Sequence, residues 1–458
     1  MALLLIYFLV LGLVCLRDLF RVKDFDDYVV AGRRQSAPFV FMSLMATVLG
    51  ASATVGVAAR AEAIGFPAFW WLGAGALGLA LQAAFLSRPV HDLDVRTLPE
   101  LAEKTVGKAG RKLVAGVIAV SWIGIVAAQF AAVAGFVGLV LGHDAGTASV
   151  LAASAVVTVY TLLGGQLSVV RTDALQFAVL AIGFAAAAVW LFGGFSGAEA
   201  AAGAPAPEGF ALLNERFGAA DLAATLLTVG GAYFLGPDVI SRNLVARDAS
   251  AARRAVAAGS VAVALFGVLV VSLGLWAAAW APNAPGESVN PLFRLVSGTL
   301  PLPLAALLSV GLLSALLSSA DTCLVNSAAI FGSDILGTRR VSTIRLLVVA
   351  IGGAATFLAL QGKGVIGLLT TAYSVYTPGI VAPLAVAIVA RGKFDVKRPA
   401  WYAGVCLGGL CGLVPALLST AGIAAPAWLP NAGIAVSLAF ALASLRRPVA
   451  SAESATGS

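Results

Sequence analysis

Residues 300–332 read LPLPLAALLSVGLLSALLSSADTCLVNSAAIFG, an apolar stretch with a single charged side chain, Asp321. A helix needs about 20 mostly apolar residues to cross a bilayer. This stretch is long enough, and similar stretches follow one another along the 458-residue chain. The composition agrees, because 60% of the residues are hydrophobic and only 11% are charged, against about 25% charged in a soluble domain. The sequence therefore predicts an all-α, polytopic membrane protein.

Thirteen stretches of this kind can be counted. In lipid only a helix or a closed barrel satisfies its own backbone hydrogen bonds, and these stretches have helical length. We therefore predict spanning helices at residues 2–20, 37–60, 65–87, 112–142, 147–164, 172–195, 219–236, 255–281, 300–332, 341–361, 364–390, 400–422 and 428–445.

The basic residues test this count, because cytoplasmic loops carry an excess of Lys and Arg. With thirteen spans and the amino terminus outside, all but four of the 29 basic residues fall on the inner side, Arg242 among them. The exceptions are Arg60, Arg216, Arg294 and Lys363. One span more or fewer would destroy this segregation. We therefore expect a multi-pass protein of the cell membrane with its amino terminus outside and its carboxyl terminus in the cytoplasm.

The same distribution accounts for the net charge of +7 without a nucleic-acid partner, since basic inner loops lie beside an anionic leaflet. The sequence contains no HExxH, Walker or Ser/His/Asp motif, so an enzyme is not expected. The remaining candidate metal ligands are scattered, and we expect no disulfide or metal cluster among Cys15, Cys323, Cys406, Cys411, His91 and His143.

Asp321 is the outlier among the acidic residues, because a charge inside a span is costly and usually functional. Ala315, Ser318, Ser319 and Thr322 are spaced at i, i+3, i+4 and i+7, so they share one helical face, and Asp321 adjoins Ser318 on it. Hydroxyls and a carboxylate suit a hard cation such as sodium. The alternative is that the hydroxyls bond to their own helix and permit close packing. The spacing leaves both interpretations open.

Two spans carry residues that weaken a helix. The span 37–60 contains Gly50 and Gly56 among small residues. Around the end of the span 219–236 the sequence has Gly230, Gly231, Gly236 and Pro237. Broken helices at matching positions of two halves indicate a transporter's binding site, because they free backbone groups for ligands. Each of these spans would open a set of five helices.

This pattern predicts two five-helix repeats with flanking segments. We expect a first helix and inner loop at 1–36, a first repeat at 37–195, an outer loop at 196–218, a second repeat at 219–390, two final helices at 391–447 and a disordered cytoplasmic tail at 448–458.

Four motifs give the chain a family resemblance. They are DDYVVAGRR at 26–34, YTLLGGQLSVVRTDALQ at 160–176, GPDVISRNLVARDASAARRA at 236–255 and SALLSSADTCLVNSAAIFGSDI at 314–335. With them the sequence resembles the solute:sodium symporter family from about Asp26 to the end of the eleventh span. The resemblance implies a LeuT-type core, a 5+5 inverted repeat, with sodium as the coupling ion.

The resemblance also implies where sodium binds. A first site would use backbone carbonyls of the first broken helix and a carbonyl and two hydroxyls of the span 300–332. The matching residues are Ala46, Leu49, Ala315, Ser318 and Ser319. Some members have a further cation position, and its counterparts would be Asp173, Ser318, Asp321 and Thr322. For Asp173 an interaction with the positive end of a helix dipole is the alternative, and it is compatible with this role.

The solute should bind near the midplane between the broken helices. Candidate side chains are Ser52, Thr54, Gln82, Gln129, Tyr233, Phe234 and Tyr373, with Thr47, Trp122 and Tyr376 nearby in the same spans. An interhelical hydrogen bond is the alternative for Gln129, and ordinary packing for the aromatic residues. The scarcity of buried charge argues against a dicarboxylate, whereas helix amino termini could hold a monocarboxylate.

The resemblance therefore implies sodium-coupled import of a small organic solute by alternating access, in a protein that works as a monomer in the lipid bilayer. A proton-coupled carrier of the same fold, with Asp173 or Asp321 titrating, is the first alternative. A channel or a membrane-embedded enzyme is the second.

Overall fold

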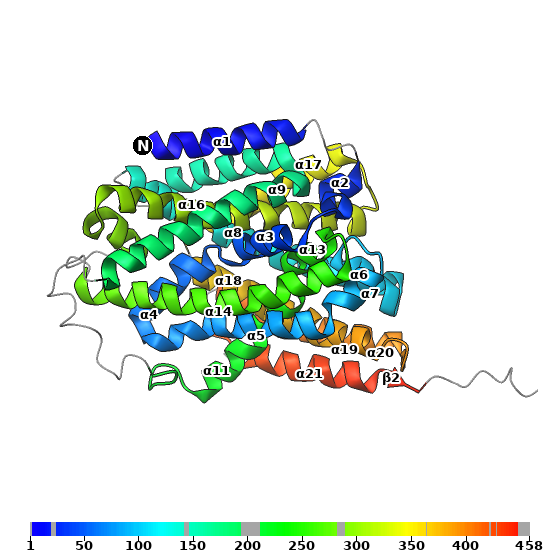
Figure 1. Cartoon of the computed structure of the whole chain (residues 1–458). Coiled ribbons are helices and arrows are strands. Elements are labelled where there is room, and N and C mark those ends of the chain that lie inside the picture. Colours follow the sequence, from blue (N-terminus) through cyan, green and yellow to red (C-terminus); the bar gives the residue numbers. More distant parts are fainter. Residues whose placement is uncertain are drawn as a thin grey trace, which may run out of the picture.

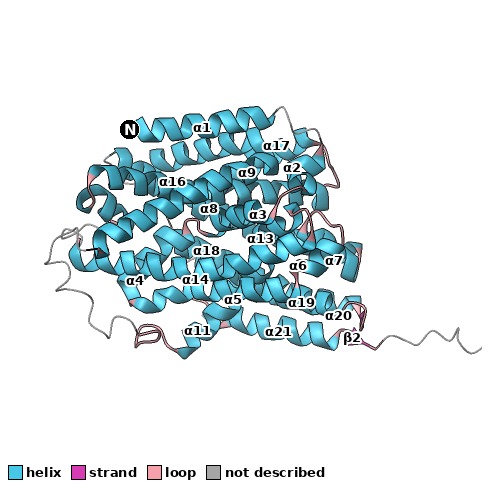
Figure 2. Ribbon diagram, viewed as in Figure 1, coloured by secondary structure: helices cyan, strands magenta, loops and turns pink. Residues whose placement is uncertain are grey.

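The computed structural model describes residues 2–19, 24–141, 146–193, 211–281, 289–362, 364–420, 423–426 and 428–447. These residues are mostly helical, and the long helices run roughly parallel in one bundle (Figures 1 and 2). Helix α1 lies along one edge of the bundle in this view and α21 along the opposite edge. The predicted tail at 448–458 and most of the predicted outer loop lie outside the described residues.

The first half of the chain forms nine numbered helices, of which α9 is bent at Gly165. At this kink φ is +58°, and an added Cβ would lie 2.6 Å from the Tyr28 ring, so glycine suits both the backbone and the space. The helices are α1 (Ala2–Leu19), α2 (Phe25–Val30), α3 (Ala37–Val48), α4 (Val57–Ile64), α5 (Trp70–Phe85), α6 (Ser87–Asp92), α7 (Leu98–Val106), α8 (Lys108–Leu141) and α9 (Thr147–Phe192).

The second half adds more helices and one short strand pair, in which β1 (Asp395–Val396) is antiparallel to β2 (Leu445–Arg446). The helices are α11 (Ala219–Thr225), α12 (Gly231–Leu235), α13 (Pro237–Val245), α14 (Ala249–Trp280), α15 (Pro291–Arg294), α16 (Leu302–Ile330), α17 (Val341–Ala359), α18 (Gly364–Tyr376), α19 (Ala382–Ala390), α20 (Arg398–Thr420) and α21 (Leu429–Ala443). Short π-helical turns extend or join several of them, at Ser52–Gly56, Leu226–Gly230, Leu295–Thr299, Phe331–Ile335 and Thr377–Val381.

A helix lies in each range where a span was predicted. Within the described residues, nine helices are long and apolar enough to cross a membrane, and the bent pair formed by α3 and α4 would make ten. Thr147–Leu162 and Leu429–Ala443 are apolar but shorter. The chain is thus a multi-pass helical protein, while the count of thirteen and the repeat boundaries stay predictions.

Loops that were predicted on one side of the membrane gather at one end of the bundle. Helices α2, α6 and α7 and strand β2 lie at the same end in Figure 1. There Arg96 pairs with Asp26, 70 residues away in sequence. At the other end Arg294 pairs with Glu62, and Arg216 donates to the carbonyl of Ala63. These contacts are therefore consistent with the predicted alternation of inner and outer loops.

Both predicted helix breaks are present. Helices α3 and α4 are bent by 57° relative to each other, and α3 ends at Val48, followed by Leu49, whose ψ of +32° leaves the helical region. Helix α12 ends at Gly236, where ψ is 140°, and α13 begins with Pro237 at its first position. Proline suits a helix start because its missing N–H needs no partner there. The second broken span therefore continues to Val245, nine residues beyond its predicted end at 236.

Helix α16 is the centre of the bundle, since it is buried at every residue from Leu308 to Ile330. It packs against α8 and α9, and its polar face meets α3. Peripheral helices differ, because α17 leaves Leu346 and Phe357 more than half exposed. Such apolar surface suits lipid, whereas the hydroxyls and Asp321 of α16 are removed from it.

Candidate functional site

The last carbonyls of α3 are the starting point of the site, because a helix end leaves its final carbonyls without backbone partners. Ser319 of α16 donates to the carbonyl of Thr47 at 2.7 Å and approaches that of Ala46 at 3.5 Å. Tyr233 of α12 donates to the carbonyl of Val48 at 3.3 Å. Two hydroxyl groups thus hold the end of α3, one from α16 and one from α12.

Gly50 lets α16 come this close. A Cβ added at Gly50 would lie 2.0 Å from Oγ of Ser319 and 3.3 Å from Oε1 of Gln129. That amide oxygen accepts from the backbone N–H of Ala51 at 3.2 Å, so Gln129 of α8 satisfies a free donor at the start of the second half-helix. The expected interhelical hydrogen bond of Gln129 is present, and Gln129 also reaches the cavity beside the break.

That cavity has a volume of about 30 Å³. It is lined by Thr47, Val48, Gly50, Ser52, Trp122, Ile125, Gln129, Ala232, Tyr233, Asp238, Val239, Ser319, Cys323 and Tyr373. A buried water needs about 10–15 Å³ of such space, so the cavity has room for about two water molecules. The chamber is therefore nearly closed in this conformation.

Some candidate solute ligands reach the cavity and others do not. Ser52, Gln129, Tyr233 and Tyr373 line it. Gln82 instead donates to the carbonyl of Phe234 at 3.1 Å, and Phe234 lies on an apolar groove with Leu77 and Leu81. Thr54 bonds back to the carbonyl of Gly50 at 2.8 Å. These three residues support the broken helices from behind the cavity.

A second cluster of buried polar groups surrounds Asp173 of α9. Its carboxylate accepts from Ser318 at 2.5 Å, from Ser43 and from Arg242 at 3.1 Å. The guanidinium of Arg242 also donates to Oγ1 of Thr322 at 2.5 Å and to Oγ1 of Thr47 at 2.6 Å. The polar ligands predicted for a further cation thus come together, and a guanidinium lies among them.

The position of Arg242 corrects the sequence analysis, which counted it among the basic residues of an inner loop. Arg242 lies on α13 and is completely buried. The error followed from ending the span at 236. A signal was available, because the short segment around this arginine contains four apolar residues: Val239, Ile240, Leu244 and Val245. Arg242 also adds a buried basic side chain to a core that the sequence analysis described as scarce in charge.

Asp321 of α16 is completely buried beside this cluster. Its Oδ1 accepts a long hydrogen bond from Thr322 at 3.4 Å. Its Oδ2 has no hydrogen-bond partner among the described residues. An unsatisfied buried carboxylate oxygen is costly, so this atom is open to a cation or a proton.

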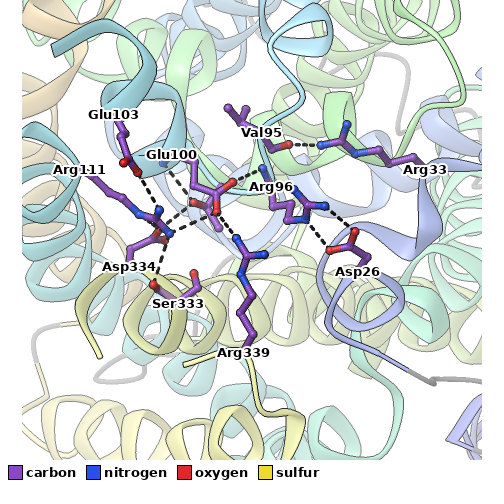
Figure 3. Close-up of polar contacts among 11 residues, drawn as sticks. Asp26, Arg33, Val95, Arg96, Glu100, Glu103, Arg111, Ser333, Asp334 and Arg339 are labelled. Carbon is purple, nitrogen blue, oxygen red and sulfur yellow. Dashed lines mark hydrogen bonds and ion pairs between the residues drawn. The ribbon is translucent and has the colours of Figure 1, made fainter. Parts of the chain in front are cut away.

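A third polar cluster closes the end of the bundle where the basic loops gather, and we call it the end cluster (Figure 3). Arg111 of α8 bonds to Asp334 at 2.6 Å, to Glu103 at 2.8 Å and to Glu100 at 3.2 Å. Arg339 also pairs with Glu100, at 3.3 Å. The cluster therefore joins α7, α8 and the segment that follows α16.

The end cluster extends to the loop before α3. Arg96 holds Asp26 through two hydrogen bonds of 2.5 and 2.8 Å, and Arg33 pairs with Asp94. The hydrogen bonds from Arg96 lower the pKa of Asp26 below its usual range. Opposite charges at this distance favour both ionised forms.

No group of three or more His, Cys, Asp or Glu side chains with the spacing of a metal site occurs in the described part of the chain. The polar groups around the break of α3 are mainly hydroxyls and carbonyls, whereas arginines pair the carboxylates of the end cluster. Oxygen ligands of this kind suit hard cations.

Comparison with known proteins decides the family. The family model of the sodium:solute symporter family matches residues 28–391. The chain belongs to the sodium:solute symporter family. A curated relative, the uncharacterized symporter YwcA of Bacillus subtilis (strain 168), is 22% identical over 94% of this chain and 87% of its own length. This family member is therefore a membrane transporter.

Solved structures agree with the fold. A Na⁺-coupled sialic acid symporter, in a substrate-bound outward-open state, has a TM-score of 0.75 at 16% identity and covers 97% of this chain and 98% of its own. Mhp1, a nucleobase-cation-symport-1 family transporter, has a TM-score of 0.62 at 14% identity, with 91% and 92% covered. MhsT in complex with L-phenylalanine has a TM-score of 0.55 at 13% identity, with 90% and 98% covered. The predicted LeuT-type fold is confirmed.

Proposed function

We propose that this family member imports a small organic solute together with sodium by alternating access. The observation that carries the proposal is the contact of Ser319 with the carbonyls of Ala46 and Thr47 at the break of the first half-helix. A hydroxyl that faces free carbonyls supplies the oxygen ligands that a hard cation prefers. We assign the coupling sodium to Ala46, Leu49, Ala315, Ser318 and Ser319.

The position of Ser319 supports coupling. It belongs to the proposed sodium site and also lines the cavity with Thr47 and Gly50. A sodium ion bound between α3 and α16 would therefore fix one wall of the solute chamber. Binding of either ligand favours the conformation in which both sites are formed, which gives reciprocal coupling. The membrane potential adds about 2.3 kcal/mol per charge per 100 mV for inward movement of the ion.

For the further cation position we propose that Arg242 supplies the charge in this conformation. Its guanidinium touches Asp173 and Thr322, two of the four residues that the family resemblance assigns to a second ion. A sodium ion in the same place would have to displace this permanently charged group. We therefore propose one coupled sodium per cycle.

We further propose a cell-membrane location, with the end cluster on the cytoplasmic side, and a functional monomer. The end cluster supports this orientation because the basic loops gather there, and cytoplasmic loops carry an excess of Lys and Arg. Proton coupling is the second candidate, since the open Oδ2 of Asp321 could carry a proton.

The test is uptake into proteoliposomes under an imposed sodium gradient or an imposed proton gradient, for a solute first identified by thermal stabilisation of the purified protein. We expect stabilisation by the solute only with sodium, and uptake with the sodium gradient. Potassium is the control ion. Uptake that follows the proton gradient and ignores sodium would contradict the assignment.

A further inference from the structure

The cavity contains a carboxylate without a cationic partner. Asp238 lies in the first turn of α13, lines the cavity and is half-buried. It accepts hydrogen bonds from the backbone at the start of α13. No ion pair of Asp238 occurs among the described residues, because the nearby Arg242 is turned toward Asp173 and Thr322. The acid thus presents its negative charge to whatever fills the chamber.

A second observation also points to a ligand. The indole of Trp122 lines the same cavity and is 1% exposed, and its Nε1–H has no hydrogen-bond partner among the described residues. A buried donor without a partner is costly, and buried indole N–H groups usually find one. An acceptor atom on a bound solute would satisfy it.

The charged side chains in this part of the core indicate which charge a bound solute carries. Asp173, Asp238 and Asp321 carry three carboxylates in this part of the core, and Arg242 supplies one positive charge. A charge in a membrane core needs a partner. Arg242 is paired with Asp173, and Asp321 is open to a cation or a proton. Asp238 is the one of the three that lines the cavity, so it is the carboxylate that a cationic group of a solute can reach.

We propose that the transported solute carries an ammonium group, primary to quaternary, together with a hydrogen-bond acceptor. The ammonium lies against Asp238 and the rings of Tyr233 and Tyr373, since aromatic faces attract cations. The acceptor faces Nε1–H of Trp122. A solute whose only charge is a carboxylate would be repelled by Asp238. The cavity is nearly closed in this conformation, so it has to widen before a solute binds. This inference rests on the proposed function.

The test uses solute pairs that differ only by replacing the charged nitrogen with carbon. L-alanine is paired with isobutyrate, choline with 3,3-dimethylbutan-1-ol, and glycine betaine with 3,3-dimethylbutanoate. Thermal stability of the full-length protein is measured in sodium as each compound is titrated. We expect at least one ammonium compound to stabilise the protein, with an apparent affinity about tenfold or more above that of its carbon isostere.

Two variants sharpen the result. Asp238→Asn should lower the affinity for the ammonium compound about tenfold or more, whereas the stabilisation by sodium alone stays and shows that the variant is folded. Trp122→Phe keeps an aromatic ring, though a smaller one, and removes the donor, so it should weaken binding of both members of a pair. Asp395→Asn, in exposed strand β1, is the control with the same loss of charge and should change neither.

Equal affinity within every pair, or no stabilisation by any ammonium compound, overturns the inference. So does an Asp238→Asn protein that still responds to sodium and binds the ammonium compound with unchanged affinity. If Asp238→Asn does not fold, the comparison of pairs in the unaltered protein decides. Failure of the proposed function looks different, because sodium then has no effect on stability or on the binding of any solute.

Discussion

The guanidinium of Arg242 lies 3.1 Å from the carboxylate of Asp173, and both side chains are completely buried. The pair joins the second broken span to α9, and its hydrogen bonds to Thr47 and Thr322 bring in α3 and α16. A buried ion pair adds little net stability, but the loss of one partner leaves an uncompensated charge. Its value here is to hold four elements in one arrangement.

Removing one member of this pair should therefore be worse than removing both. We expect Arg242→Gln to lower the free energy of unfolding by about 3–5 kcal/mol. The double variant with Asp173→Asn should recover a large part of that loss, because no buried charge is left without a partner. Thermal unfolding of the four proteins in a double-mutant cycle measures the coupling. Strictly additive effects would show that the pair does not act as a unit.

Sodium dependence should identify Ser319 as a ligand. We expect Ser319→Ala to raise the sodium concentration for half-maximal uptake about tenfold or more, because one oxygen of the ion's shell is lost. Ser309→Ala is the matched control on the same helix, since Ser309 is buried but bonds only to the carbonyl of Ala305, one turn back. The same sodium concentration for half-maximal uptake in the two variants would show that Ser319 is not a sodium ligand.

The close approach at Gly50 should not tolerate a methyl group. We expect Gly50→Ala to force α16 away from the broken helix, at a cost of about 1–3 kcal/mol in stability, and to reduce sodium affinity with it. Gly116→Ala on α8 is the control, because an added Cβ there meets nothing within 4 Å. Gly116→Ala should leave stability unchanged or raise it slightly. Wild-type sodium affinity in Gly50→Ala would show that the contact is not needed.

Much of this site follows from local sequence rules. Apolar length predicted the helices, and the spacing of Ser318, Ser319 and Thr322 placed them on the face of α16 that meets α3 and α9. Gly50 and Gly236 marked the positions where the spans break, because both weaken a helix locally. These features depend on neighbouring residues in the chain, so the sequence contains the information.

The partners across the bundle could not be predicted in the same way. Asp238 and Arg242 belong to a helix that restarts at Pro237, and their surroundings come from α3, α8, α9 and α16. The sequence analysis ended the span at 236, before Asp238 and Arg242, whereas the spanning helix continues to Val245. Gln82 and Phe234 are the reverse case, since both were chosen by residue type and neither lines the cavity in this conformation.

The pair of Asp26 and Arg96 should respond to acid. Because Arg96 lowers the pKa of Asp26, ionised Asp26 contributes stability above its usual pKa of 3.8, and this contribution is lost as the pH falls through the lowered value. We expect Asp26→Asn to lower stability by no more than about 1 kcal/mol, since Asp26 is 44% exposed. Thermal unfolding should give a difference that is constant near neutral pH, shrinks below the usual pKa and vanishes below the lowered pKa. A difference that grows in acid would contradict the ion pair.

Arg111 should matter far more, because its partner Asp334 has no exposed side-chain surface. We expect Arg111→Ala to cost about 3 kcal/mol by leaving a buried carboxylate without its cation. Arg88→Ala removes an arginine from an exposed pair with Asp92 and should change stability little.

Loss of Arg111 also uncouples α7 from the segment after α16 and should open this end of the bundle more often. Cys323 can report such opening, because it lines the cavity and is 2% exposed. In a protein without Cys15, Cys406 and Cys411, we expect Arg111→Ala to react faster with a small thiol reagent at Cys323 than the Arg88→Ala control. The reagent is added from the end-cluster side of oriented vesicles. Equal reaction rates would mean that the end cluster stabilises the fold without limiting access to the cavity.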